Sequence, residues 1–309
     1  MRKLISSTFF ILFAIAVLSL QSCSQGVDTF DIDAHHDEII DWRAGRLERL
    51  MAPMGYLNLA GLFWLEPGTA TFGSAPVNDL VFPASAATVI GEFSVSDDGI
   101  FMTVADGVDV RSGDLAIESI LIVDDTGDEP VTITHGSLAW TAVKRDNRYA
   151  VRLRDFQHPA LVAFGELPYY AVDPDLRVTA TLRRYAEPRT VNVGTVIEGL
   201  GWNPRSPGMV SFAINGEAFE LEAYESGERL FFVFGDATNR DDTYGAGRFL
   251  YSQVPADDGL LVLDFNKSYS PPCAFNDFAT CPIASPRNRL AVRIEAGEKF
   301  NSALHYAAH

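Results

Sequence analysis

The chain is poor in the residues from which metal centres are usually built. Its 309 residues include three cysteines and six histidines. Three cysteines exclude a zinc site with four cysteine ligands, and no histidine lies near Cys273 or Cys281 to complete a mixed site. Between the N-terminal region and the C-terminal tail the only histidines are His135 and His158, which we interpret as structural. We therefore predict no metal site and no cofactor.

Familiar catalytic motifs are also missing. The sequence has no G-x-S-x-G turn that would present a serine nucleophile and no H-E-x-x-H pattern that would bind catalytic zinc. It has no P-loop and no G-x-G-x-x-G motif after a predicted strand. No pair of nucleophile and base can therefore be recognised from motifs, and any activity must come from another arrangement of residues.

Basic residues are scarce relative to acidic ones. The chain contains 24 lysines and arginines against 41 aspartates and glutamates, which gives a formal net charge of −17. A surface this acidic repels the phosphates of nucleic acids and the headgroups of anionic lipids. We expect no nucleic-acid partner and no membrane binding that depends on charge.

The N-terminus reads as an export signal. Arg2 and Lys3 precede an apolar stretch over residues 4–20, which is typical of a secretion signal and marginal for a permanent span of about 20 residues. The stretch ends in Leu-Gln-Ser-Cys, and this resembles a lipobox whose cysteine, here Cys23, receives a lipid. The alternative is an ordinary cleavable signal followed by an incidental cysteine.

The lipobox predicts the location of the protein. We expect a signal peptide over residues 1–22, a lipid anchor on Cys23 and a polar tether over residues 23–34. Ser24, directly after the anchor, resembles an outer-membrane address in enterobacterial sorting. The expected location is the bacterial cell envelope, lipid-anchored at the outer membrane and facing the periplasm or the surface. The membrane is then a partner through the anchor.

Two cysteines remain once Cys23 carries a lipid. Cys273 and Cys281 are separated by seven residues, in a compartment that permits disulfides. They can form a disulfide, remain free structural thiols, or serve metal or redox chemistry. We predict the disulfide.

A short helix is expected over residues 35–55. Ile39, Leu47 and Leu50 recur there at helical spacing with charged residues between them, and the pattern ends near Pro53. The expected role of this helix is to pack on the body of the protein.

Beyond this helix the hydrophobic period changes from helical to alternating. Apolar and other residues alternate over residues 149–154, and Asn215-Gly216 separates two alternating segments, which is a strong signal for a β-hairpin. The fold class is therefore mainly β. We expect two associated β-sandwich or barrel-like units behind the N-terminal helix, over residues 56–148 and 149–309.

The first unit resembles a forkhead-associated domain. Residues 72–144, with Gly73, Asn78 and Asp79 at their start, are similar to the opening of that small β-sandwich. The family reads phosphothreonine with an arginine directly after the glycine, and this position is Ser74 here. The resemblance implies the fold and not the phosphate recognition.

Polar residues that follow predicted strands are concentrated between residues 236 and 298. Asp264 and Asn266 lie two apart at the end of an apolar strand, so they share one face. A rigid loop closed by the cysteine pair would hold such residues around a pocket. Architectural ion pairs and loop hydrogen bonds account for the same pattern. The candidate ligand-binding residues are Asp236, Tyr244, Arg248, Asp264, Asn266, Tyr269 and Asn288.

The same segment contains a series of short motifs: Asp264-Phe265-Asn266, Pro272-Cys273-Ala274-Phe275, Thr280-Cys281-Pro282, Asn288-Arg289-Leu290 and Ala296-Gly297-Glu298-Lys299. In these motifs the chain resembles the DUF1684 family, and the resemblance extends over nearly all of the chain after the tether. The family has no established activity, so the resemblance implies no catalytic residue.

Three functions follow from these observations. The leading hypothesis is an envelope lipoprotein that binds a small polar or sugar-like ligand at the 236–298 cluster. The second is a hydrolase-type enzyme with Asp236 and Asp264 as general acid and base, and with Arg248 or Tyr244 stabilising charge. The third is a purely structural envelope protein. A shared open cavity would favour the first two, and complete burial of the cluster would favour the third.

Overall fold

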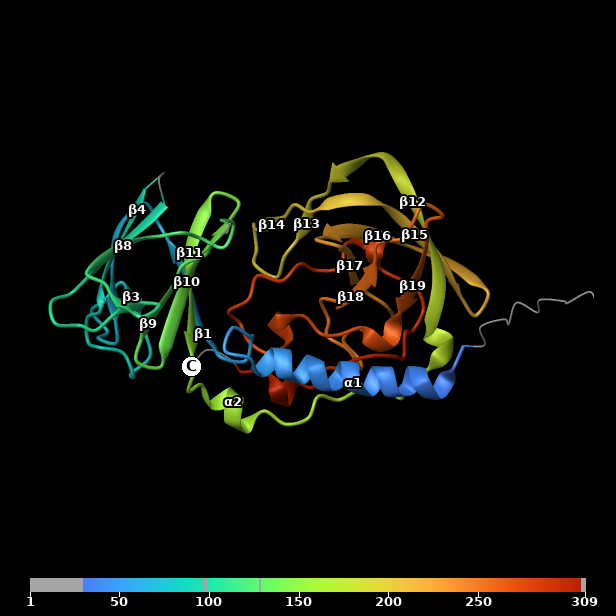
Figure 1. Ribbon diagram of the computed structural model, residues 1–309, viewed down its shortest axis with the longest axis horizontal. Coiled ribbons are helices and arrows are strands. Elements are labelled where there is room, and N and C mark those ends of the chain that lie inside the picture. Colours follow the sequence, from blue (N-terminus) through green and yellow to red (C-terminus); the bar gives the residue numbers. More distant parts are fainter. Residues whose placement is uncertain (1–29, 97–98, 128, 307–309) are drawn as a thin grey trace, which may run out of the picture.

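The computed structural model describes residues 30–96, 99–127 and 129–306. The predicted signal peptide and the predicted lipid anchor at Cys23 lie outside these residues. The described part contains a long helix and two β units that lie side by side, with the chain crossing from one to the other (Figure 1). Among these residues no helix is long and apolar enough to cross a membrane.

Helix α1 (Ile32–Met51) begins a few residues earlier than the sequence predicts. Asp31 caps it, because its carboxylate accepts hydrogen bonds from the backbone N–H groups of Asp33 and Ala34 at 3.1 and 3.0 Å. The helix ends just before Pro53, because a proline disfavours helical backbone in the residue that precedes it. It lies along the C-terminal unit (Figure 1), to which it is joined by the Arg46–Glu298 ion pair and the His35–Asp264 hydrogen bond.

The N-terminal unit is a β-sandwich. One sheet has the order β1-β11-β10-β9-β6-β7 and the other has the order β3-β2-β4-β5-β8. Phe72 and Phe93 from one sheet pack against Trp140 from the other, and all three are fully buried. The strands are β1 Leu59–Leu65, β2 Gly68–Gly73, β3 Leu80–Val81, β4 Gly91–Ser96, β5 Gly99–Val104, β6 Arg111–Ser112, β7 Leu115–Ala116, β8 Ser119–Ile122, β9 Thr132–His135, β10 Leu138–Arg145 and β11 Arg148–Asp155.

The boundary between the two units lies later than the predicted division between residues 148 and 149. Strand β11 crosses that division and pairs with both β10 and β1 of the N-terminal sheet. The N-terminal unit therefore runs to Asp155. The prediction separated the two strands of one hairpin, because the turn between them resembles a linker in sequence.

The C-terminal unit is a nearly closed barrel with the strand order β18-β17-β16-β15-β12-β19. The hydroxyl of Ser252 on β18 donates to the carbonyl of Val262 on β19 at 2.8 Å, which joins the two edge strands. The interior is apolar, with Phe232, Phe234 and Phe265 fully buried. The strands are β12 Arg177–Thr190, β15 Arg205–Ile214, β16 Glu217–Ser226, β17 Arg229–Phe234, β18 Arg248–Gln253 and β19 Leu260–Asp264, and a separate ribbon contains β13 Val193–Gly194 and β14 Gly201–Trp202.

The hairpin predicted at Asn215-Gly216 is present between β15 and β16. Both residues have positive φ, 52° and 80°, as this turn requires. The mainly-β class, with two β units behind a helix, is therefore confirmed. Short helices fill the remaining connections: α2 Pro159–Ala163, η1 Pro174–Leu176, η2 Phe265–Lys267, η3 Pro272–Ala274, η4 Pro286–Asn288 and η5 Ser302–Leu304.

Candidate functional site: a basic cleft between the two units

Two of the predicted site residues, Asp236 and Arg248, form a buried ion pair in the C-terminal unit. The Arg248 Nη2 atom donates to the Asp236 carboxylate at 2.8 Å and to the carbonyl of Ile294 at 2.8 Å. The other Asp236 oxygen accepts from the backbone and hydroxyl of Thr238 at 2.8 and 2.6 Å. Neither side chain of the ion pair is exposed. The pair therefore holds the loop after β17 against the segment around Ile294.

Asp264 belongs to a different buried pair. Its carboxylate contacts His35 Nε2 on α1 at 2.8 Å, and its other oxygen accepts from the backbone N–H of Asn266 at 3.1 Å. It attaches the helix to the end of β19 and caps η2. Asp236 and Asp264 thus occupy separate, internally paired environments, and neither lines a cleft described below. The arrangement offers no shared site for an acid and a base.

Asn266 and Asn288 are fully buried and act as substitutes for backbone peptide groups. The Asn266 amide accepts from the N–H of Asp173 at 2.9 Å and donates to its carbonyl at 2.7 Å. The Asn288 amide accepts from the N–H of Glu222 at 2.8 Å and donates to its carbonyl at 3.0 Å. Side chains that satisfy buried backbone in this way are unavailable to a ligand.

The two predicted tyrosines are partly buried and pack against different neighbours. Tyr244 packs on Phe300 with ring centroids 5.3 Å apart. Tyr269 lies beneath the guanidinium of Arg46, 4.5 Å from the ring centroid, and burial raises its pKa. The seven predicted residues therefore do not surround one open cavity. This corrects the position of the predicted site, because the cluster stabilises the barrel and its attached helix.

The cysteine pair is placed as predicted. The sulfurs of Cys273 and Cys281 lie at disulfide distance, and their Cα atoms are 6.2 Å apart, within the range that a disulfide spans. In the chain-entropy model a loop of this size contributes roughly 2–3 kcal/mol to stability. The loop that the pair closes lies at the junction of the two units.

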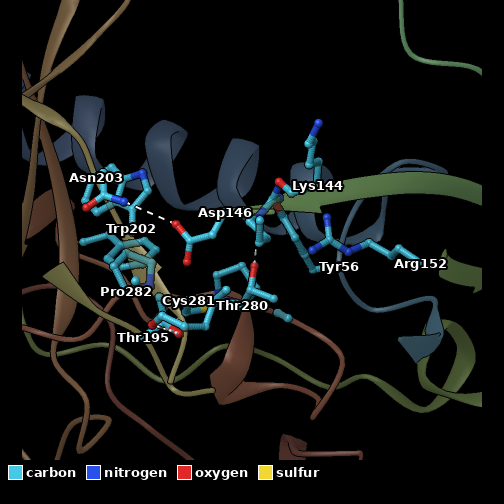
Figure 2. Close-up of a pocket in the computed structure, with 16 residues that line it drawn as sticks. Tyr56, Lys144, Asp146, Arg152, Thr195, Trp202, Asn203, Thr280, Cys281 and Pro282 are labelled. Atoms are coloured by element: carbon cyan, nitrogen blue, oxygen red, sulfur yellow. Dashed lines mark hydrogen bonds between the residues drawn. The ribbon is translucent and has the colours of Figure 1, made fainter. Parts of the chain in front are cut away.

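A cleft of about 440 Å³ lies at this junction and is lined by both units (Figure 2). The N-terminal side of the cleft consists of the segment between α1 and β1, through Tyr56, and the β10–β11 hairpin, through Lys144, Arg145, Asp146 and Arg152. The C-terminal unit contributes the β13–β14 ribbon and the disulfide loop, mainly through Thr195, Trp202, Asn203, Phe249, Thr280 and Cys281.

Two hydrogen bonds cross the cleft and fix its width. The Asn203 amide donates to the carboxylate of Asp146 at 3.4 Å, and Arg145 Nε donates to the hydroxyl of Thr280 at 3.4 Å (Figure 2). Asp146 is at the tip of the hairpin with a φ of 51°, which places its side chain toward the other unit. The shape of the cleft therefore depends on how the two units pack against each other.

The cleft is basic although the protein is acidic. Lys144, Arg145 and Arg152 line it with one acidic residue, Asp146. Arg145 is paired to Asp125 at 2.6 and 2.9 Å, whereas Arg152 is 9% exposed and its pKa is lowered by burial and by neighbouring Arg145. The described part contains no group of three potential ligands that would hold a metal ion.

A second groove continues from the cleft toward α1. It encloses about 570 Å³ and shares Tyr56, Phe249 and Pro272 with the cleft. Arginines and aromatic rings of α1 and the barrel line it, including Arg49 and Arg229. Of the seven predicted site residues, only Tyr269 lines the second groove and none lines the cleft. The available signal was the alternation over residues 149–154, which places Arg152 and Arg154 on one face of a strand.

The C-terminal unit matches a known family. Residues 162–299 match the model of DUF1684, described as a protein of unknown function. Over these residues the chain belongs to the DUF1684 family. The match covers the barrel and the disulfide loop, a shorter stretch than the resemblance in sequence suggests. Tyr56, Lys144 and Arg152 lie outside it.

Other comparisons add no function. A solution NMR structure of an uncharacterized protein from Haloarcula marismortui is 31% identical in sequence, covering 44% of this chain and 77% of that chain with a TM-score of 0.38. No curated protein matches the DUF1684 chain. The resemblance of residues 72–144 to a forkhead-associated domain stays a prediction.

Proposed function

We propose that this protein is a lipid-anchored cell-envelope protein that binds a small polar ligand in the cleft between its two β units. The observation that carries the proposal is the cleft itself, which is walled by both units and has a volume within the range of about 300–1,000 Å³ that ligand sites occupy. The membrane is a partner only through the lipid on Cys23.

The lining favours a ligand that is polar with an apolar face. Trp202 and Phe249 supply aromatic surface, and the hydroxyls of Thr195 and Thr280 supply hydrogen-bonding groups. Together with the charged groups of Lys144, Arg145 and Arg152, they give a wall on which polar groups and aromatic surface are mixed. The 236–298 segment takes part through its disulfide loop, and the buried ion pairs around Asp236 and Asp264 hold the barrel from which that loop extends.

Filling the cleft should abolish ligand binding. A thermal-shift screen of small polar compounds is expected to give hits, because a ligand at 100 times its dissociation constant stabilises the native state by about 2.7 kcal/mol. Thr280→Trp is expected to remove the shift by occupying the cleft. Thr181→Trp, at an exposed position on β12, is the matched control and should retain it. Hits that survive Thr280→Trp would place binding elsewhere and overturn the proposal.

The anchor is tested separately at Cys23. In a bacterial host the protein should incorporate labelled palmitate and sediment with membranes, since a lipobox cysteine is the attachment point. Cys23→Ser should lose both the label and the sedimentation, whereas the double variant Cys273→Ser, Cys281→Ser should keep the label. Label that persists in Cys23→Ser would contradict the lipid anchor.

A further inference from the structure

Strand β11 contains two buried arginines without an ionic partner, and the first of them, Arg152, lines the cleft. Arg152 and Arg154 on β11 are 9% and 6% exposed. Within the described residues, neither takes part in an ion pair, and the buried Nε atom of each has no hydrogen-bond partner. The other buried arginines and carboxylates there have a side-chain partner: Arg46 pairs with Glu298, Arg189 with Glu222 and Arg248 with Asp236, and Asp264 is hydrogen-bonded to His35.

Their burial follows from the position of β11 between the two units. Side chains alternate along the strand, so Val151 and Leu153 enter the sandwich core while Arg152 and Arg154 point to the opposite face. That face is covered by the C-terminal unit, where Leu59 of the neighbouring strand packs with the disulfide loop. The guanidinium groups are therefore desolvated by the same contact that forms the cleft.

Two like charges in this setting destabilise the free protein. Burying a charged group that has no partner of opposite charge is costly. The Cα atoms of Arg152 and Arg154 are roughly 7 Å apart along the strand, so the two charges also repel each other. The nearby carboxylate of Asp125 is already held by Arg145. Burial and the neighbouring Arg152 lower the pKa of Arg154 to about 10, so Arg154 is still charged at neutral pH.

We propose that Arg152 binds an oxyanion, a carboxylate or a phosphate, that forms the charged end of the ligand in the cleft, and that the buried charge of Arg154 behind it strengthens the attraction. The inference rests on the proposed function and names the chemical class of that ligand. Arginine suits this role because its planar donors match the two oxygens of such a group. Arg152 lines the cleft beside Tyr56 (Figure 2), so an anion entering from the cleft reaches it directly.

The surrounding charges favour the same class of ligand. Lys144 and Arg145 stand at the mouth of the cleft, and Arg49 and Arg229 line the adjoining groove. In a protein with a net charge of −17 this basic lining is local. A concave site lined by positive charge concentrates small anions. The acidic exterior repels large polyanions, which cannot enter the cleft.

Titration calorimetry on the purified protein tests the inference with two probes, sodium phosphate and sodium succinate, against sodium chloride of equal ionic strength. At least one oxyanion should bind, and the probe that binds identifies the source of the charge. Arg152→Gln should weaken this binding about 10- to 100-fold, the effect of losing a charge-assisted pair of hydrogen bonds. Arg152→Lys should retain part of it. Arg184→Gln, an exposed arginine on β12, should leave it unchanged.

Stability without ligand separates a binding role from a structural one. In buffer without oxyanions, Arg152→Gln should keep or raise the melting temperature, because it removes an unpaired buried charge. A lowered melting temperature would show that Arg152 supports the fold and would overturn the inference.

Failure of the inference and failure of the proposed function give different results. If uncharged polar compounds bind in a way that Thr280→Trp blocks, while neither oxyanion binds and Arg152→Gln has no effect, the ligand class is wrong and the cleft remains a binding site. If neither the oxyanions nor the uncharged compounds bind, both proposals are overturned.

Discussion

Replacing Arg248 with methionine is expected to lower the free energy of unfolding by about 3–5 kcal/mol, the usual cost of breaking a buried ion pair from one side. The substitution leaves the Asp236 carboxylate in a site with no exposed side-chain surface. It also removes the donors to the carbonyls of Ile294 and Ala296, which are buried with it. The segment after η4 then loses its main attachment to β18.

Urea unfolding, followed by tryptophan fluorescence, measures this effect as a shift of the midpoint at constant slope. Arg293→Met is the matched control. Arg293 is an exposed arginine with several carboxylate partners, and its loss should cost less than about 1 kcal/mol. The double variant Arg248→Met, Asp236→Leu should recover much of the stability. A cost below 1 kcal/mol for Arg248→Met alone would contradict an architectural role.

The local structure was predictable because its signals are local. Helix α1 follows from the spacing of Ile39 and Leu50, and the β15–β16 hairpin follows from Asn215-Gly216. The mainly-β fold class could be derived because the spacing of apolar residues changes from helical to alternating after α1. The division between the units could not, since nothing in the sequence around residue 148 distinguishes the turn of a hairpin from a linker.

The candidate site was harder to predict because it depends on what covers each strand. Alternation along β11 places Arg152 and Arg154 on one face, but a strand does not reveal whether that face meets solvent or a second unit. Only the packed structure shows the C-terminal unit over them. For the same reason the polar 236–298 cluster looked like a pocket, whereas most of its side chains are buried and satisfied within the fold.

The polar cluster and the cleft are connected through the architecture. The pairs His35–Asp264 and Arg46–Glu298 fix α1 to the barrel, and the chain leaves α1 directly at Tyr56, on the wall of the cleft. The position of the N-terminal unit, and with it of Arg152, therefore depends on buried polar contacts in the C-terminal unit. Residues that do not touch a ligand can thus control the shape of its site.

Asn288→Ala should be the second most damaging substitution, with a loss of about 3–4 kcal/mol in the free energy of unfolding. The register of Tyr224 with Phe231 would place Glu222 opposite Val233, and the Asn288 amide lies between these two residues where β16 and β17 separate. Alanine leaves the N–H and carbonyl of Glu222 and the carbonyl of Val233 buried without this partner. Each such group costs roughly 1–3 kcal/mol.

The same urea titration measures this loss, with two further variants to identify its cause. Asn192→Ala removes an exposed asparagine that makes one side-chain hydrogen bond, and it should cost less than about 1 kcal/mol. Asn288→Asp keeps the shape and the acceptor for the Glu222 N–H but loses both donors, so it should be nearly as harmful as alanine. If Asn288→Asp were as stable as the wild type, the donors to Glu222 and Val233 would not be what holds β16 and β17 together.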